Sequence, residues 1–275
     1  MTMLAVTGST GKIGGRVAQL LAGAGIPQRL VVRDPGRAPT LPDAQVVTAG
    51  YRDGAAARTA LSGVTTLFMV SGTETEDRLS EHRTFVDAAA AAGVERIVYL
   101  SFYGASPDAT FTLARDHWAT EEHIRASGLR YTFVRDNLYL DYLPYFAGDE
   151  GVLRGPAGDG RVAAVAQSDI SDVVAAILAE PEAHEATTYS LTGSEALTLH
   201  EVAAILGPDV RYEPETVEEA YASRAKYGAP QWQLDAWVTT YTAIATGELA
   251  GITDTVERLT GHPPLTLAEL VSRTD

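Results

Sequence analysis

The first part of the chain alternates short apolar runs with longer segments whose apolar residues recur at helical spacing. An apolar run at residues 4–7 is followed by a turn and then by a helical pattern, formed by Val17, Leu20, Leu21 and Ala24. Gly25 is a stop signal, and residues 30–32 form a second apolar run. A strand, a helix and a second strand within about thirty residues predict a β-α-β unit with parallel strands.

This alternation continues to residue 135. The pattern predicts further strands at residues 44–48, 66–70, 96–101 and 131–135, and helices at 54–61, 76–92 and 113–127. Gly93 and Gly128 are the expected stops of the last two helices. Strands that alternate with helices in this way are covered on both faces, so we predict an α/β fold built on a doubly wound parallel sheet.

Three glycines lie between the first strand and the first helix at the spacing Gly-x-x-Gly-x-x-Gly. Glycine takes a positive φ at low cost, and its missing Cβ lets the backbone approach a pyrophosphate. The free N–H groups and the positive dipole end of the following helix favour phosphate at the same place. A plain glycine-rich turn is the alternative, but the β-α-β setting favours a dinucleotide site. The predicted residues of this site are Gly8, Ser9, Thr10, Gly11, Lys12, Ile13 and Gly14.

The end of the second strand indicates which nicotinamide cofactor is preferred. Folds that select NAD usually carry Asp or Glu there for the ribose 2′-hydroxyl, whereas this chain has Arg33, then Asp34 and, one turn on, Arg37. Guanidinium groups pair well with a 2′-phosphate and stack on adenine. Both arginines could instead be solvated surface residues, and Asp34 weakens the case for the phosphate. We predict NADP(H) as the cofactor.

Other residues are expected at the same edge of the sheet, because open α/β sheets bind ligands across the carboxyl ends of their strands. Met69, Val70, Ser71 and Ser101 end two of the predicted strands and are expected beside the cofactor. Asp53 follows the third strand, where it could accept from the adenine amino group or cap the next helix. The cap is the stronger expectation of the two.

Beyond residue 136 the chain becomes rich in aromatic and turn residues. A helix at 171–179 and a strand at 188–191 are expected to rejoin the sheet, and capping boxes beginning at Thr198 and Thr266 predict two later helices, with Gly261 ending a helix between them. We therefore predict a Rossmann-type domain and a smaller, mostly helical C-terminal substrate lobe. The expected domain comprises residues 1–136 with 162–193 returning to it, and the lobe comprises 137–161 and 194–275.

Composition narrows the classes of partner. The net charge of -15 at pH 7 disfavours nucleic acid and anionic lipid surfaces, so we expect neither as a partner. The chain has no cysteine, which excludes disulfides and thiolate nucleophiles, and it shows no leader and no spanning segment, so we expect a cytoplasmic protein. The six histidines show no ligand spacing, and no metal site is predicted. A homodimer is left open.

The helix predicted at 113–127 lacks the Tyr-x-x-x-Lys pair by which short-chain dehydrogenases transfer a proton. The chain nevertheless resembles a group of atypical short-chain dehydrogenases, the NmrA-like family, over nearly its whole length. The resemblance rests on Thr7-Gly8-Ser9-Thr10-Gly11-Lys12-Ile13-Gly14, on Val32-Arg33-Asp34-Pro35, on His117-x-x-Thr120-Glu121 followed by Ser127-Gly128-Leu129, and on Tyr131-Thr132-Phe133-Val134-Arg135-Asp136-Asn137-Leu138-Tyr139.

This resemblance implies an oxidoreductase that binds NADP(H) through Gly8, Gly11, Gly14 and Arg33. Its quinone- and dye-reducing members, which the chain resembles most, imply hydride transfer to a small conjugated acceptor. The product of such a reduction is stabilised by conjugation, so a tuned proton donor is less necessary than for a simple ketone. Correct positioning of nicotinamide and acceptor then accounts for most of the rate.

Five residues are candidates for orienting the acceptor or stabilising charge on its oxygen: Ser101, Tyr103, His117, Asn137 and Tyr139. His117 could equally be a structural histidine, Asn137 could turn the chain, and Tyr139 could be packing core. We predict an NADPH-dependent oxidoreductase acting on a quinone-like acceptor. The alternatives are an NADP(H)-sensing regulator without turnover and a reductase of a biosynthetic carbonyl or enone intermediate.

Overall fold

The computed structural model describes residues 3–273, which form two compact units. The first unit comprises the described residues up to Phe102, together with Asp116–Arg135 and Ile170–Tyr189. The second comprises Tyr103–Arg115, Asp136–Asp169 and the described residues from Ser190 onward. No helix within residues 3–273 has the length and apolar character that crossing a bilayer would require.

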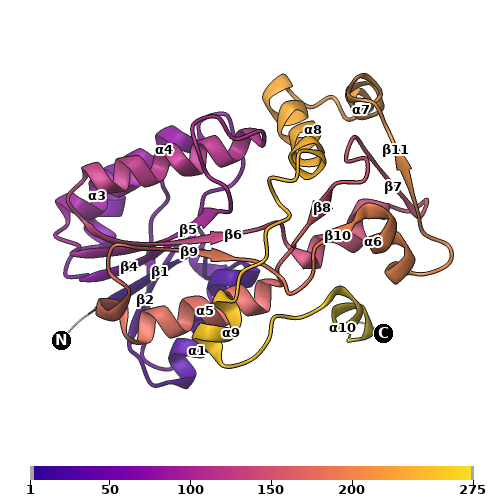
Figure 1. The fold of residues 1–275 in the computed structure, drawn as a ribbon. Helices are drawn as coiled ribbons and strands as arrows, with labels where there is room; N and C mark the ends of the chain where they lie inside the picture. Colours follow the sequence, from indigo (N-terminus) through magenta and orange to yellow (C-terminus); the bar gives the residue numbers. More distant parts are fainter. Residues whose placement is uncertain (1–2, 274–275) are drawn as a thin grey trace. The chain divides into compact units, whose positions relative to one another are not determined.

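A seven-stranded sheet with the order β3-β2-β1-β4-β5-β6-β9 is the centre of the fold (Figure 1). Neighbouring strands pair in parallel from β3 through β2, β1 and β4 to β5. The doubly wound α/β sheet predicted from the sequence is therefore confirmed. Its strands are β1 (Leu4–Thr7), β2 (Gln28–Val32), β3 (Ala44–Thr48), β4 (Thr66–Met69), β5 (Arg96–Phe102), β6 (Arg130–Asp136) and β9 (Thr187–Leu191).

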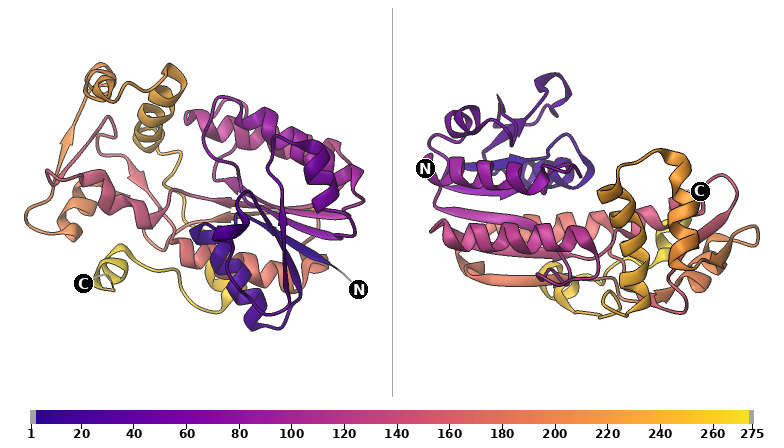
Figure 2. Two further views of the ribbon diagram at one scale, coloured as in Figure 1. Left: turned by 180° about the vertical axis from the view of Figure 1, so that it is seen from behind. Right: turned by 90° about the horizontal axis from the view of Figure 1, so that it is seen from above.

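Helices cover both faces of this sheet, with α3 and α4 on one face and α1 and α5 on the other (Figure 1). In the view from above, α3 and α4 run side by side (Figure 2), and a hydrogen bond of 2.7 Å joins His123 to Asp87 between them. The helices lie close to their predicted positions and differ only at the ends. They are α1 (Lys12–Gly23), α2 (Gly54–Ala60), α3 (Arg78–Ala91), α4 (Thr112–Ala126) and α5 (Gln167–Ala179).

The central strands β1, β4 and β5 are buried along their whole length, because successive side chains point to opposite faces and both faces are covered. Leu67 and Met69 of β4, with Ile97 and Tyr99 of β5, belong to the core that also contains Phe85 of α3. Phe68 and Val98 alternate with them and are likewise fully buried. This packing fixes the strand ends from which the loops of the site extend.

The second unit contains two small sheets and most of the later helices. β8 (Arg161–Val162) pairs antiparallel with β10 (Leu197–Thr198), and β7 (Val152–Gly155) pairs in parallel with β11 (Arg211–Pro214). The capping boxes at Thr198 and Thr266 form as predicted, and Gly261 ends α9 with a left-handed φ of +78°. The helices are α6 (Leu199–Leu206), α7 (Val217–Arg224), α8 (Gln231–Ala245), α9 (Thr255–Thr260) and α10 (Leu267–Ser272).

The unit boundaries differ from the domain limits expected from the sequence. Residues 103–115 belong to the second unit, where Thr110 bonds to Glu248 and the Thr112 N–H donates to Thr239. Only Ile170–Tyr189 of the expected returning segment joins the first unit, because Val162 pairs within β8 and β10. Contacts between distant parts of the chain decide these boundaries, and composition does not reveal them.

Candidate functional site

The site lies at the carboxyl edge of the sheet, between β1 and β4. From β1 the chain builds β2 and β3 on one side and then crosses over to β4 on the other. Open α/β sheets bind ligands at such a reversal of strand order, outside the carboxyl ends of the two strands. By this rule the glycine turn after β1 and the loop after β4 are the expected walls of a ligand crevice.

The three glycines of the turn differ in what they make room for. Gly8 has a φ of +65°, and a Cβ added to it would lie 2.9 Å from Cβ of Val70. A Cβ on Gly14 would lie 2.5 Å from the carbonyl oxygen of Gly8, so both residues are required by the turn itself. Gly11 is exposed, and a Cβ there would meet only the Gly8 oxygen, at 3.3 Å. Its missing side chain leaves space on the open side of the turn.

The start of α1 suits a phosphate group. Its N-cap residue is Gly11, no side chain caps the helix, and no acidic residue lies in its first turn. The backbone N–H groups of the first turn therefore keep their capacity for an anion. Ser9 is buried and its Oγ has no partner within residues 3–273, whereas Thr10 and Lys12 are exposed and Ile13 packs into the core. These residues fit a dinucleotide pyrophosphate.

The end of β2 presents two exposed guanidinium groups. Neither Arg33 nor Arg37 forms an ion pair within the described part of the chain. The Arg33 stem lies beside Gly50, whose added Cβ would be 3.7 Å from Arg33 Cγ. Asp34 accepts the N–H of Gly36 at 2.9 Å and thereby caps the short 3₁₀ helix η1 (Pro35–Arg37). The carboxylate is held in that turn, and the net charge of the strand end suits an anion.

The opposite wall is the strand-four loop, residues 70–72, whose first residue is fixed by hydrogen bonds. The N–H of Val70 donates to Thr7 Oγ1 at 2.9 Å, and its carbonyl accepts from the Tyr51 hydroxyl at 2.6 Å. The two hydroxyls also bond to each other at 2.7 Å, and the Tyr51 ring stacks on Phe85. Burial raises the pKa of Tyr51, so the phenol keeps its proton and its donor role.

Gly72, the last residue of this loop, is held by two side chains of α3. Its N–H donates to Nε2 of His82 at 2.7 Å, and its carbonyl accepts from Nε of Arg78 at 3.1 Å. A Cβ on Gly72 would lie 3.1 Å from the same His82 nitrogen, so glycine permits the close approach. Arg78 and His82 are four residues apart and therefore project from the same face of α3.

The donors around the two buried histidines assign their tautomers. His82 accepts from Gly72 at Nε2, so its Nδ1 carries the proton and donates to Thr120 at 3.0 Å. His117 accepts from Nη2 of Arg78 at 2.9 Å, and its Nδ1–H donates to the Tyr99 hydroxyl at 3.0 Å. Both ring nitrogens of His117 are thus engaged within the first unit.

Both imidazoles are neutral. Burial, followed by the nearby Arg78 guanidinium, lowers the pKa of His82 from 6.5 to about 3. The same two causes, in the same order, lower the pKa of His117 well below its usual value. Neither histidine is therefore an imidazolium that could act as a general acid near neutral pH.

Ser101 also bonds inside the first unit. Its hydroxyl donates to Glu121 at 2.6 Å, and Glu121, which is fully buried, forms two hydrogen bonds of 2.8 and 2.6 Å with Arg135. The motif His117-x-x-Thr120-Glu121 thus places three buried polar side chains on one helix, and their partners come from α3, β5 and β6. This motif ties secondary-structure elements together.

The other candidate residues lie in the second unit. Asn137 is buried, donates to the Leu249 carbonyl at 3.0 Å and accepts the Leu138 N–H at 2.8 Å, so its amide turns the chain. Tyr103 is half-buried, and a Cβ on Gly251 would lie 2.2 Å from its hydroxyl. Tyr139 is half-buried and contacts Tyr142 edge-on at 5.5 Å.

Two further residue sets have structural partners. Asp53 accepts the N–H of Ala56 at 2.9 Å and so caps α2.

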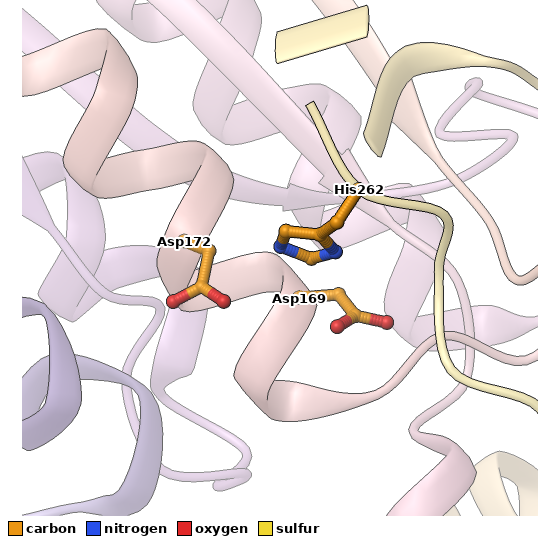
Figure 3. A group of neighbouring side chains, drawn as sticks. All are labelled: Asp169, Asp172 and His262. Atoms are coloured by element: carbon orange, nitrogen blue, oxygen red, sulfur yellow. The ribbon is translucent and has the colours of Figure 1, made fainter. Parts of the chain in front are cut away.

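Figure 3 shows three side chains that could offer ligands to a cation, Asp169, Asp172 and His262. Asp172 pairs with Arg16 at 2.8 Å in the first unit, and Asp169 accepts the N–H of Leu265 at 2.8 Å in the second. Both carboxylates therefore have partners on the protein.

Four residues of the site were absent from the sequence predictions: Thr7 as a loop anchor, Tyr51, Arg78 and His82. The four-residue spacing of Arg78 and His82, on the helix that follows the fourth strand, is the one sequence signal that could have indicated the last two. Their partners are defined only by the packing of α3 against the sheet.

We expect acid to destabilise the fold in the pH range where histidine titrates in an unfolded chain. As the pH falls below about 6.5, the unfolded state takes up protons that His82 and His117 do not accept in the folded state. Each histidine then removes up to about 1.4 kcal/mol of unfolding free energy per pH unit. Urea unfolding between about pH 7.5 and 5 measures this slope. His82→Gln should make it shallower, and an unchanged slope would contradict the assignment.

Comparison with known proteins gives consistent matches along the chain. A sequence model of the NmrA-like family matches residues 2–222. Quinone oxidoreductase 2 of Escherichia coli (strain K12) is 35% identical over 282 residues, which cover 98% of this chain and 98% of the relative.

Two solved structures extend the match to the fold. The NADPH-dependent quinone oxidoreductase of Escherichia coli complexed with NADPH has a TM-score of 0.91 at 33% identity, covering 99% of each chain. The Citrobacter sp. triphenylmethane reductase complexed with NADP(H) has a TM-score of 0.87 at 31% identity, covering 99% of this chain and 100% of that one. As the sequence resemblance predicted, the chain belongs to the NmrA-like family.

Proposed function

We propose that this chain is an NADPH-dependent oxidoreductase that transfers hydride to a quinone-like or other conjugated small-molecule acceptor. One observation carries the proposal: α1 begins after the glycine turn of β1 without a side-chain cap, and the neighbouring strand β2 ends at two exposed arginines that form no ion pair within residues 3–273. The first feature suits a pyrophosphate and the second a 2′-phosphate. Together they match the two anionic groups of NADPH.

The acceptor class is supported by the relatives. One is named a quinone oxidoreductase, and another is a triphenylmethane reductase complexed with NADP(H). Quinones and triphenylmethane dyes are both conjugated electrophiles, whose reduction leaves a delocalised product. A chain without the Tyr-x-x-x-Lys pair is suited to such acceptors, because the reaction needs little help from an acid.

In this mechanism the residues of the chain bind the cofactor and position the acceptor. When bound, NADPH supplies the hydride. The amides around Gly11 hold the pyrophosphate, Arg33 and Arg37 hold the 2′-phosphate, and the strand-four loop forms the fixed wall of the crevice. We assign no proton transfer to His117 or Ser101, since their polar atoms bond inside the first unit. Tyr103 and Tyr139 are the proposed contacts for orienting the acceptor.

The direct test is oxidation of NADPH, followed by its absorbance, with a panel of quinones, triphenylmethane dyes, azo dyes and enones. We expect turnover with at least one conjugated acceptor and none with simple ketones. Tyr103→Phe should lower the rate by no more than about a hundredfold, the low end of general acid–base contributions. Tight binding of NADPH without turnover on any acceptor would favour the regulator over the enzyme.

Arg33→Ala should weaken NADPH binding and leave NADH binding nearly unchanged, because only NADPH carries the 2′-phosphate. The expected loss is about 1.5–3 kcal/mol, the range for a hydrogen bond to a charged group. Fluorescence titration of both cofactors measures it. Arg83→Ala, which removes an exposed arginine of α3, is the charge-matched control. Equal losses for both cofactors would contradict the assignment of Arg33.

Gly11→Val should abolish cofactor binding in a folded protein, because the new side chain occupies the open side of the turn. Gly14→Val should instead unfold the turn, since its Cβ would lie 2.5 Å from a backbone oxygen. Gly23→Val is the matched control, at an exposed position of α1 where a Cβ meets nothing within 4 Å. Thermal unfolding with and without NADPH separates the three variants. A normal NADPH shift in Gly11→Val would show that the turn is only structural.

A further inference from the structure

We propose that His82, assisted by Arg78, is a positioning residue for the cofactor. It acts through the backbone of the strand-four loop and contacts no reacting atom itself. This inference rests on the proposed binding of NADPH in the crevice between β1 and β4. It assigns a specific task to a buried histidine of α3 that the reaction itself does not use.

The argument begins with the backbone of the strand-four loop. The N–H and carbonyl of Val70 bond to Thr7 and Tyr51, and those of Gly72 bond to His82 and Arg78. Four side chains thus hold the four polar backbone groups on either side of Ser71. Water could satisfy such half-buried groups, but four side chains do so here, and this fixes the backbone of the loop.

Ser71 is the residue that this arrangement leaves available. It is half-buried, and within residues 3–273 its N–H, carbonyl and hydroxyl have no hydrogen-bond partner. The Val70 carbonyl and the Gly72 N–H belong to the two peptide groups that flank Ser71, so the N–H and carbonyl of Ser71 are held in fixed directions while its hydroxyl can rotate. In the crevice opposite the glycine turn, they are the groups of this wall that remain for a ligand.

The burial of His82 indicates that its loop bond is more than a packing contact. Its side chain is fully buried, and a buried polar ring is costly unless both nitrogens are bonded. An apolar residue would pack α3 against the sheet without that requirement. A separate bond from His123 to Asp87 already joins α3 to α4. What His82 adds is the bond to the Gly72 amide.

His82→Leu tests this role, with His82→Gln as the conservative variant whose side-chain oxygen can still accept from Gly72. His123→Leu is the matched control, because it removes a histidine bond between the same two helices away from the loop. Arg78→Met, which loses the bond to the Gly72 carbonyl, is the second variant if His82→Leu does not fold. Each is measured by NADPH titration, by KM and kcat, and by hydrogen exchange of the Gly72 amide without cofactor.

We expect His82→Leu to raise Kd and KM for NADPH by about tenfold, which corresponds to the loss of one hydrogen bond. The change in kcat should be smaller. Exchange of the Gly72 amide should accelerate in the same variant, and His82→Gln should restore most of both. His123→Leu should change neither. If the wild type binds NADPH and His82→Leu binds it with the same Kd, this inference is overturned and the proposed function is not. Failure of the wild type to bind NADPH would overturn the proposed function and this inference together.

Discussion

A buried positive charge, the guanidinium of Arg78, is the constraint on which the interior of the first unit depends. Its side chain is only 4% exposed, and its nearest carboxylate, on Asp116, lies 4.0 Å away. A buried cation is tolerated only where acceptors replace its water. The carbonyl of Gly72 and Nε2 of His117 serve as those acceptors. The position of the strand-four loop and the tautomer of His117 therefore follow from the same requirement.

Burial, with this charge as the second cause, lowers the pKa of both histidines and keeps them neutral, which gives the hydrogen-bond network a single donor direction. A proton on either ring would lie beside Arg78 without water to screen it, so each ring accepts at Nε2 and donates at Nδ1. From Gly72 the donor direction runs through His82 and Thr120 to the carbonyl of Asp116 on α4. Since each hydrogen bond in this series has only one possible donor, the network is compatible with one arrangement of the loop and the two helices.

The sequence predicted the local parts of this structure and missed what depends on packing. The glycine turn and the strand-end arginines could be found because spacing within a few residues defines them. Ser101 was placed on the right strand, but its role depends on a hydrogen bond to Glu121. Only the packing of α4 against β5 brings these two side chains together. Tyr51 and His82 carry no motif of their own. The pairing of β7 with β11 was missed because such short strands show no periodicity and their partners lie far apart in the chain.

Asp34 illustrates how a charged residue can mislead when it is judged only by its position after a strand. Its carboxylate is held by the amide of Gly36, so it shapes the turn that follows β2. An attempt to redesign this enzyme for the cheaper, non-phosphorylated dinucleotide would gain nothing from the acid that is already there. The new acid would have to replace Arg33, while the Asp34 cap is kept so that the turn survives the exchange. On the proposed assignment of Arg33, two neighbouring positions serve different purposes, one cofactor recognition and the other backbone shape.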